Sequence, residues 1–94
     1  MIYCIFMKTE LGKREGKLSL TKEGKKLKGS LMILRHTNPV SGEMDNDKMG
    51  WIQGTLQTYA YTLDYKLVFQ INMDLIRGEM ETSKGKFQIE GYQI

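Results

Sequence analysis

The sequence predicts an all-β fold, an eight-stranded antiparallel up-and-down meander barrel formed by a single domain over residues 1–94. Three observations predict it: a recurring apolar–x–Gly–x–apolar pattern, alternation of apolar and polar residues, and short intervals between the alternating segments. The full pattern occurs at residues 27–31, 40–44, 52–56 and 76–80. Its glycines, together with those of two partial matches, fall at 16, 29, 42, 54, 78 and 91. A repeat this short is typical of one strand and one turn.

The length and composition fit one small hydrophobic core. The chain has 94 residues, of which 40% are hydrophobic and 27% are charged, and this is enough for one core but not for two. Its single cysteine, Cys4, can form no disulfide within the chain, so we expect a reducing compartment and a cytoplasmic location. The apolar first seven residues end at Lys8 and are too short for a signal peptide or a membrane span. We therefore expect a buried strand there and no membrane partner.

In the first half, alternation predicts strands at about residues 2–9, 14–22, 26–35 and 40–46. The first strand is apolar on both faces, which indicates that both faces are covered. Turns are expected at 10–13, at 22–25, where Gly24 can adopt a positive φ, and at 36–39, because Pro39 cannot donate to a strand ladder.

In the second half, strands are expected at about 51–58, 61–72, 75–82 and 86–94, with turns at 46–50, near 59–60 and at 83–85. The third of these turns contains Gly85. The long strand lacks the glycine of its neighbours and alternates without interruption from Tyr59 to Met73. Parallel crossovers need longer connections than these turns provide, so the strands must form an antiparallel meander. Closure of that meander into a barrel would remove its exposed edges.

The glycines of the repeat fall on the apolar, inward face. Glycine weakens a strand, but it allows the sharp coiling that a narrow barrel needs. We expect Tyr65 and Leu67 of the long strand to lie across the gaps left by Gly54 and Gly78 on the two adjacent strands.

The interior of an eight-stranded barrel can be filled by side chains or can hold one small ligand, and the sequence leaves both outcomes open. The bulky inward residues are numerous enough to fill it; they are Ile5, Leu18, Leu31, Met44, Leu56, Tyr61, Leu63, Tyr65, Phe69, Met80 and Phe87. If a small apolar ligand binds in the barrel mouth, the candidate lining residues are Met44, Leu56, Tyr61, Leu63, Tyr65, Phe69 and Met80.

Apolar residues on the outer face form the candidate interface. Met32 and Leu34 are expected to point outward from the third strand. Because the last strand pairs with the first in a closed meander, Tyr92, Ile94 and the outer face of the first strand should form one contiguous patch. Such a patch is typical of a protein partner or of a homo-oligomer.

No constellation of residues points to catalysis, a cofactor or a metal. His36 is the only histidine, so with Cys4 it cannot complete a zinc site, and we read it as a solvated turn residue. No serine lies in a Gly-x-Ser-x-Gly elbow. The acidic residues at 43–47 lack the later ligands of a calcium loop, where Leu56 stands instead of glutamate. We therefore expect a binding protein that is not an enzyme.

The net charge of +3 is unevenly distributed. Residues 8–28 hold eight basic and three acidic residues, so this segment carries +5 and the rest of the chain −2. Nucleic acid is a minor alternative partner for this hairpin, because the segment lacks the aromatic residues on which bases stack. Lysines on an exposed hairpin more often keep a protein soluble.

The glycine-punctuated meander resembles the calycin-like barrels, especially the avidin and streptavidin type. The resemblance covers the whole chain and lies in the strand pattern. The Gly-x-Trp of lipocalins is absent near the first strand, since the single tryptophan, Trp51, directly follows Gly50, and no polar set matches a biotin site. The resemblance implies small-molecule binding at one barrel end and oligomers. A self-associating structural module with a filled core is the alternative function.

Overall fold

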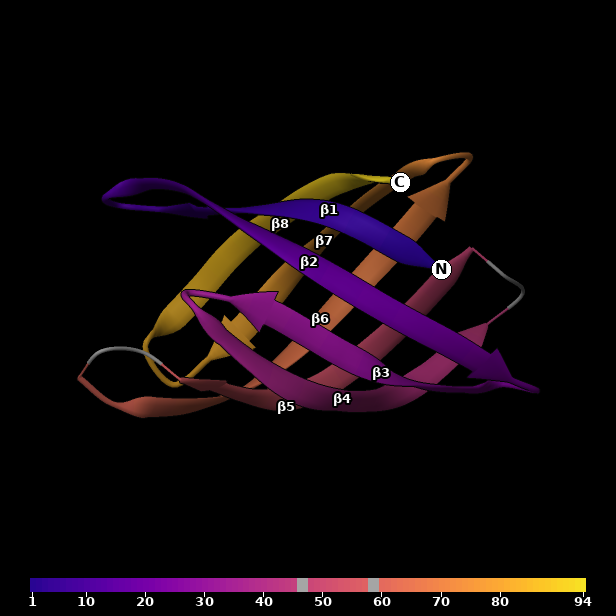
Figure 1. Cartoon of the computed structure of the whole chain (residues 1–94), viewed down its shortest axis with the longest axis horizontal. Helices are drawn as coiled ribbons and strands as arrows, with labels where there is room; N and C mark the ends of the chain where they lie inside the picture. Colours follow the sequence, from indigo (N-terminus) through magenta and orange to yellow (C-terminus); the bar gives the residue numbers. More distant parts are fainter. Residues whose placement is uncertain (46–47, 58–59) are drawn as a thin grey trace.

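The computed structural model describes residues 1–45, 48–57 and 60–94. Over these residues, eight strands form a closed barrel in which each strand pairs with the next and the last returns to the first (Figure 1). Every pairing is antiparallel, which confirms the predicted fold class. The strands are β1 (Ile2–Thr9), β2 (Gly12–Glu23), β3 (Lys26–Ile33), β4 (His36–Asp45), β5 (Met49–Gln57), β6 (Thr62–Asn72), β7 (Leu75–Thr82) and β8 (Gly85–Gln93).

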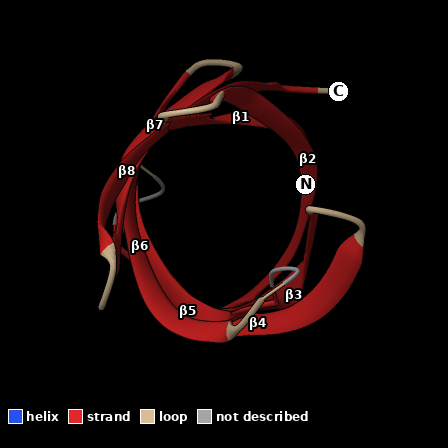
Figure 2. Cartoon of the chain, turned by 90° about the vertical axis from the view of Figure 1, so that its left-hand side faces the viewer, coloured by secondary structure: helices blue, strands red, loops and turns tan. Residues whose placement is uncertain are grey.

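The barrel closes where β8 lies beside β1. Ile5 of β1 stands opposite Gly16 of β2 on one side and opposite Gly91 of β8 on the other. Beyond β8, the Ile94 amide donates to the Ile2 carbonyl at 2.8 Å. The molecule measures 36 × 20 × 20 Å, and the end-on view shows the strands forming a continuous wall around one interior (Figure 2). Closure pairs the strand edges that an open sheet would leave exposed.

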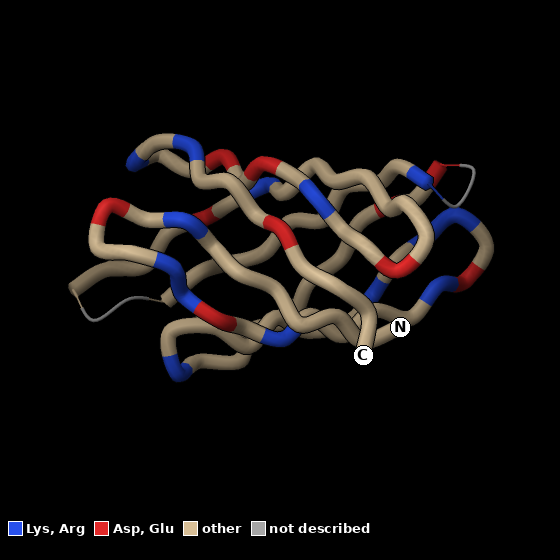
Figure 3. The backbone as a smooth tube through the Cα atoms, turned by 90° about the horizontal axis from the view of Figure 1, so that it is seen from above, with Lys and Arg blue, Asp and Glu red and all other residues tan. Residues whose placement is uncertain are grey.

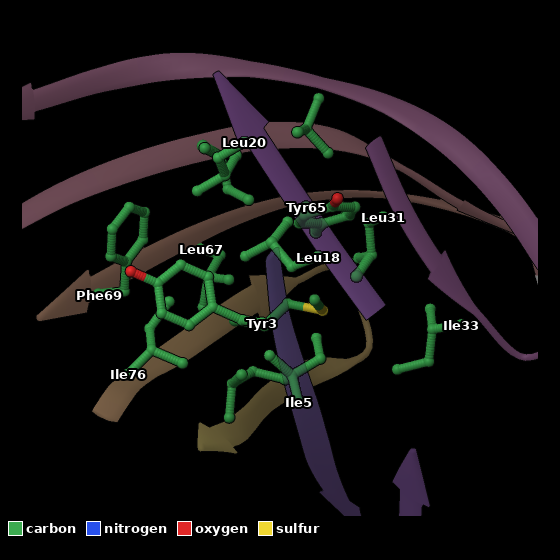
Figure 4. Close-up of a cluster of buried hydrophobic side chains, with 14 of the residues drawn as sticks. Tyr3, Ile5, Leu18, Leu20, Leu31, Ile33, Tyr65, Leu67, Phe69 and Ile76 are labelled. Atoms are coloured by element: carbon green, nitrogen blue, oxygen red, sulfur yellow. The ribbon is translucent and has the colours of Figure 1, made fainter. Parts of the chain in front are cut away.

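Alternation along each strand sorts the side chains between interior and surface. In β6, Leu63, Tyr65, Leu67 and Phe69 are buried, while the intervening residues are exposed. Side chains from β1, β2, β3, β6 and β7 meet inside the barrel (Figure 4). The core is therefore assembled from all parts of the chain, and the 2-residue period of the sequence identifies most of its members.

Glycines on the inward face permit close approach of neighbouring strands. A methyl group added at Gly78 would collide with the Val68 carbonyl oxygen and would lie 2.9 Å from the Phe69 Cα. Gly54 stands opposite Tyr65, as expected. The expected placement of Leu67 over Gly78 is wrong: Phe69 stands opposite Gly78, because only two residues separate β6 from β7 and this short turn fixes the register.

The expected turn at residues 36–39 is also wrong. The chain turns at Leu34 and Arg35, whose φ values are 54° and 68°, and His36 already begins β4 opposite Ile33. Pro39 lies inside β4 without disrupting the sheet, because the pairing with β5 begins only at Val40. Among the described residues, 36–39 pair with β3 alone, and such a singly paired stretch is where a strand tolerates proline.

Several other strand ends differ from expectation. β2 begins at Gly12, two residues early, because the preceding turn is short, and β5 begins at Met49, which pairs with both Asp45 and Gln70. The turn expected at 22–25 is shorter in the structure: Lys22 and Glu23 still belong to β2, and the chain turns at Gly24 and Lys25, with Gly24 at the predicted positive φ, 62°. Asn46 and Asp47 of the expected turn at 46–50, and Thr58 and Tyr59 near the expected turn at 59–60, lie outside the described residues.

Candidate functional site

The predicted lining residues of the barrel interior are brought together with one exception. Six of them belong to the single buried core, namely Met44, Leu56, Leu63, Tyr65, Phe69 and Met80. Tyr61 does not: it is 47% exposed and precedes the first residue of β6. Its ring lies 5.2 Å from the Lys84 ammonium on the surface. Placing Tyr61 inside was wrong because the strand begins one residue later than the alternation suggested.

Side chains occupy the interior across its width. Tyr3, Leu18 and Phe69 are almost fully buried, and in Figure 4 they converge from β1, β2 and β6. Hollows of about 230, 490, 520 and 430 Å³ occur on the described surface, and each is lined largely by residues with outward side chains. Of the two alternatives, an interior filled by side chains and an interior that holds a small ligand, this arrangement favours the filled interior.

The hydroxyl of Tyr65 is an unusual feature of this core. The Tyr65 Oη is buried, and it has no hydrogen-bond partner among the described residues. Burial raises the pKa of Tyr65 strongly, because charge in an apolar interior is costly. Tyr3 has a weak partner, since its hydroxyl donates to the Met1 Sδ at 3.8 Å. Burial first and the Asp74 carboxylate second raise the pKa of Tyr3.

Five outward residues on β1, β7 and β8 and at the C-terminal end form the feature that we call the apolar patch: Ile2, Phe6, Leu75, Tyr92 and Ile94. Tyr92 stands between Leu75 of β7 and Cys4 of β1, and its ring lies 6.4 Å from that of Phe6. Ile94, Leu75 and Tyr92 are 70%, 61% and 48% exposed. The predicted contiguous patch is therefore present, and Leu75 is a member that the sequence reasoning missed.

A hollow of about 490 Å³ adjoins the apolar patch. Phe6, Leu75 and Tyr92 supply its apolar wall, and Arg77 and Glu90 supply charged groups at its margin. Glu90 is already paired with lysines, at 3.6 Å from Lys8 and 3.9 Å from Lys13. An apolar centre with a charged rim resembles the anatomy of protein interfaces.

Cys4 anchors the underside of the apolar patch. Its thiol is buried and donates to Glu15 Oε1 at 3.2 Å. A hydrogen bond with Cys4 is the main cause that raises the pKa of Tyr92, and burial and Glu15 contribute less. The Tyr92 hydroxyl is therefore held against β1.

The other two candidate interface residues do not join this patch. Met32 is exposed on β3, but Lys17 of β2 stands between it and Cys4. Leu34 is not an outward strand residue: it occupies the turn before β4 and packs partly against the core. Its left-handed backbone breaks the alternation from which the outward placement was read.

A second apolar surface on β5 and β6 was not predicted. Met49, Trp51 and Val68 all point outward; Trp51 stands opposite Val68, and the Lys66 ammonium lies 5.1 Å from the indole ring. The signal was present, because Trp51 and Val68 occupy polar-face positions of their alternating strands. A hollow of about 230 Å³ lies beside them.

Basic and acidic residues are interspersed along the strands and turns (Figure 3). Lys26 on the basic hairpin stands between Glu23 of β2 and Glu43 of β4. The hairpin is thus less uniformly basic than its sequence segment, which weakens the case for a phosphate backbone as partner. In the described part of the chain, no helix is long and apolar enough to cross a membrane.

Comparison with protein-family models, with curated proteins and with solved structures finds no match to this chain.

Proposed function

We propose that this chain is a non-enzymatic interaction module, in which the filled barrel is a rigid scaffold and the apolar patch binds a protein partner. The carrying observation is that four exposed apolar residues are contiguous: Ile2, Leu75 and Tyr92 lie on three neighbouring strands, and Ile94 follows β8 beside Ile2. Contiguous apolar surface of this kind is rare on monomers unless it binds something. Tyr92 is the expected hot spot, because tyrosine combines large contact area with few rotatable bonds.

A small apolar ligand in the barrel is the weaker candidate. The strand order is consistent with that of the calycin-like barrels, and the resemblance of this chain to those barrels implies such a ligand. In this chain, however, Tyr65 and Phe69 are packed into the core, so a ligand would have to displace them. Displacement of close-packed core side chains is costly.

Nucleic acid on the 8–28 hairpin is the minor candidate. It predicts salt-sensitive retention on heparin that charge reversal of Lys25, Lys26 and Lys28 abolishes. A cytoplasmic location remains the expectation from the single cysteine.

Site-specific photocrosslinking in the expressing cell tests the proposal. A benzophenone amino acid replaces Tyr92 in one sample and Met32, which is exposed but outside the apolar patch, in the control. The proposal predicts a discrete crosslinked polypeptide at position 92 and none at position 32. Equal labelling at the two positions, or no polypeptide adduct at position 92, would overturn it.

A further inference from the structure

Resting on the proposed function, we infer that the occupant of the apolar patch is a second copy of this chain, bound about a two-fold axis that runs along the boundary between β8 and β1. A two-fold interface must be self-complementary, since residue i contacts residue j of the partner and residue j contacts residue i. The charges that flank the apolar patch meet this requirement.

The first charge relationship lies in one row across four strands. In this row, Arg77 stands beside Glu90, Glu90 beside Phe6, and Phe6 beside Glu15. Arg77 on β7 and Glu15 on β2 are therefore equally far from the β8–β1 boundary. A two-fold axis along that boundary places Arg77 of each copy opposite Glu15 of the other, which forms two symmetric ion pairs.

Arg77 is available for an ion pair with a second copy. Across the described ranges, with their gaps at 46–47 and 58–59, Arg77 makes no ion pair, and the neighbouring Glu90 pairs with Lys8 and Lys13. Within the described part of the chain, the Glu15 side chain accepts a hydrogen bond from the Cys4 thiol at 3.2 Å and makes no ion pair. Both side chains are exposed, so each can reach across an interface.

The next row repeats the complementarity with the signs exchanged. Glu79 on β7 stands beside Gln88 of β8, and Lys8 of β1 stands beside Lys13 of β2. The same axis brings Glu79 toward Lys13 of the other copy. Within its own chain Glu79 pairs with Lys86 at 3.5 Å and Lys13 pairs with Glu90 at 3.9 Å, so the contact between copies would join existing ion pairs. Two rows of opposite sign disfavour other alignments of the two barrels, because a slip along the strands would oppose like charges.

The apolar residues form the row beside these two charged rows. Leu75, Tyr92, Cys4 and Lys17 form the row adjacent to that of Arg77. The axis brings the two Tyr92 rings together over the buried thiols, and it sets Leu75 against the aliphatic stem of Lys17 of the other copy. The result is an apolar row with rows of charged residues along one side of it.

A charge-swap experiment tests whether the occupant of the apolar patch is a second copy of this chain. Sedimentation equilibrium over a range of concentrations gives the dimer dissociation constant of the wild type, of Arg77→Glu, of Glu15→Arg and of the double variant. Each single variant places like charges together and is expected to weaken dimerisation about tenfold or more, whereas the double variant restores opposite pairs and most of the affinity. Lys28→Glu, a charge reversal on β3 outside the interface, is the matched control, and thermal unfolding verifies that each variant is folded.

The outcomes separate this inference from the proposed function. A wild type that stays monomeric, or a dimer that is indifferent to the single reversals or is not restored by the double swap, overturns the second copy. If the protein is monomeric but position 92 still crosslinks to a different polypeptide, the proposed function survives and the identity of the partner changes. If it is monomeric and position 92 crosslinks to no polypeptide, both fail.

Discussion

Tyr65 covers Gly54 inside the barrel. The two residues stand opposite each other on β6 and β5, and a methyl group added at position 54 would lie 3.0 Å from the Tyr65 hydroxyl oxygen. The missing side chain of one strand is therefore filled by the ring of its neighbour. This pair explains both why the repeat keeps a glycine at position 54 and why the long strand does not carry one opposite it.

The cost of adding a methyl group should differ between two inward glycines. At Gly78 the added group meets the Val68 carbonyl and the Phe69 backbone, whereas at Gly54 its neighbours are the Tyr65 hydroxyl and the Pro39 carbonyl at 3.0 Å. We expect Gly78→Ala to lower the free energy of unfolding by about 2 kcal/mol or more, and Gly54→Ala by less. Gly78→Val and Gly54→Val should each cost about 2 kcal/mol or more.

Urea unfolding measures these changes, and Gly54→Ala combined with Tyr65→Phe completes a double-mutant cycle. Because the two sites touch, Gly54→Ala should lower the free energy of unfolding by less in the Tyr65→Phe background than in the wild type. Neutral effects at both glycines would contradict their inward placement.

Tyr65→Phe should stabilise the protein. The substitution removes a buried hydroxyl that lacks a partner, and such a group costs about 1–3 kcal/mol in protein mutational data. We expect the free energy of unfolding to rise by about 1 kcal/mol. Tyr3→Phe is the matched control, because it removes a hydroxyl that has a sulfur partner and should gain less. A loss of stability in Tyr65→Phe would show that the hydroxyl is satisfied in solution.

The free energy of unfolding should decrease at alkaline pH because of the two core tyrosines, Tyr3 and Tyr65. Burial raises the pKa of both above the ordinary 10.0, so between pH 10 and the raised values only the unfolded chain releases these protons. The folded state then binds more protons than the unfolded state, and the free energy of unfolding decreases as the pH rises. Below pH 10 these groups leave the stability unchanged.

Urea midpoints measured from pH 8 to pH 11 test this dependence. Tyr65→Phe should make the alkaline decline shallower than that of the wild type, and the remaining slope should contain the contribution of Tyr3. An identical decline in wild type and variant would contradict the assignment to Tyr65.

The turn between β3 and β4 should accept glycine with a gain in stability. Arg35 has a φ of 68°, in a region where a non-glycine residue costs about 1–2 kcal/mol. Part of this gain is offset because glycine adds entropy to the unfolded chain, so we expect Arg35→Gly to raise the free energy of unfolding by about 0.5 kcal/mol. The reverse change, Gly24→Ala at φ 62° with no atom within 4 Å, should lower it. Equal signs for the two variants would contradict the left-handed assignment.

The sequence was sufficient for the barrel because alternation is a local property. The period of β6 placed Tyr65 and Phe69 inside, and the closure of a meander predicted that Tyr92 would lie beside β1. The turn at Leu34 and Arg35 could not be read locally, since neither residue type favours positive φ. The expectation for Pro39 is wrong for a long-range reason: among the described residues, the β4–β5 ladder begins at Val40, just after the proline, and only the folded sheet reveals where that pairing begins.

The candidate site was predictable to a similar degree. Tyr92 and Ile94 followed from strand order, but Leu75 did not, because it lies just after a turn and its partner Tyr92 is defined only by the register of β7 with β8. The charge complementarity of Arg77 and Glu15 also depends on registers across four strands. No pattern within either segment indicates it.

Native mass spectrometry of the protein and of Tyr92→Glu, purified in parallel, tests the central claim most directly. A filled barrel that binds protein through its outer face predicts a second polypeptide on the wild type, its loss from Tyr92→Glu, and no retained small molecule in either sample. A single chain that carries the same small-molecule mass in both samples would contradict the claim, because the ligand would then occupy the interior and the outer face would bind nothing.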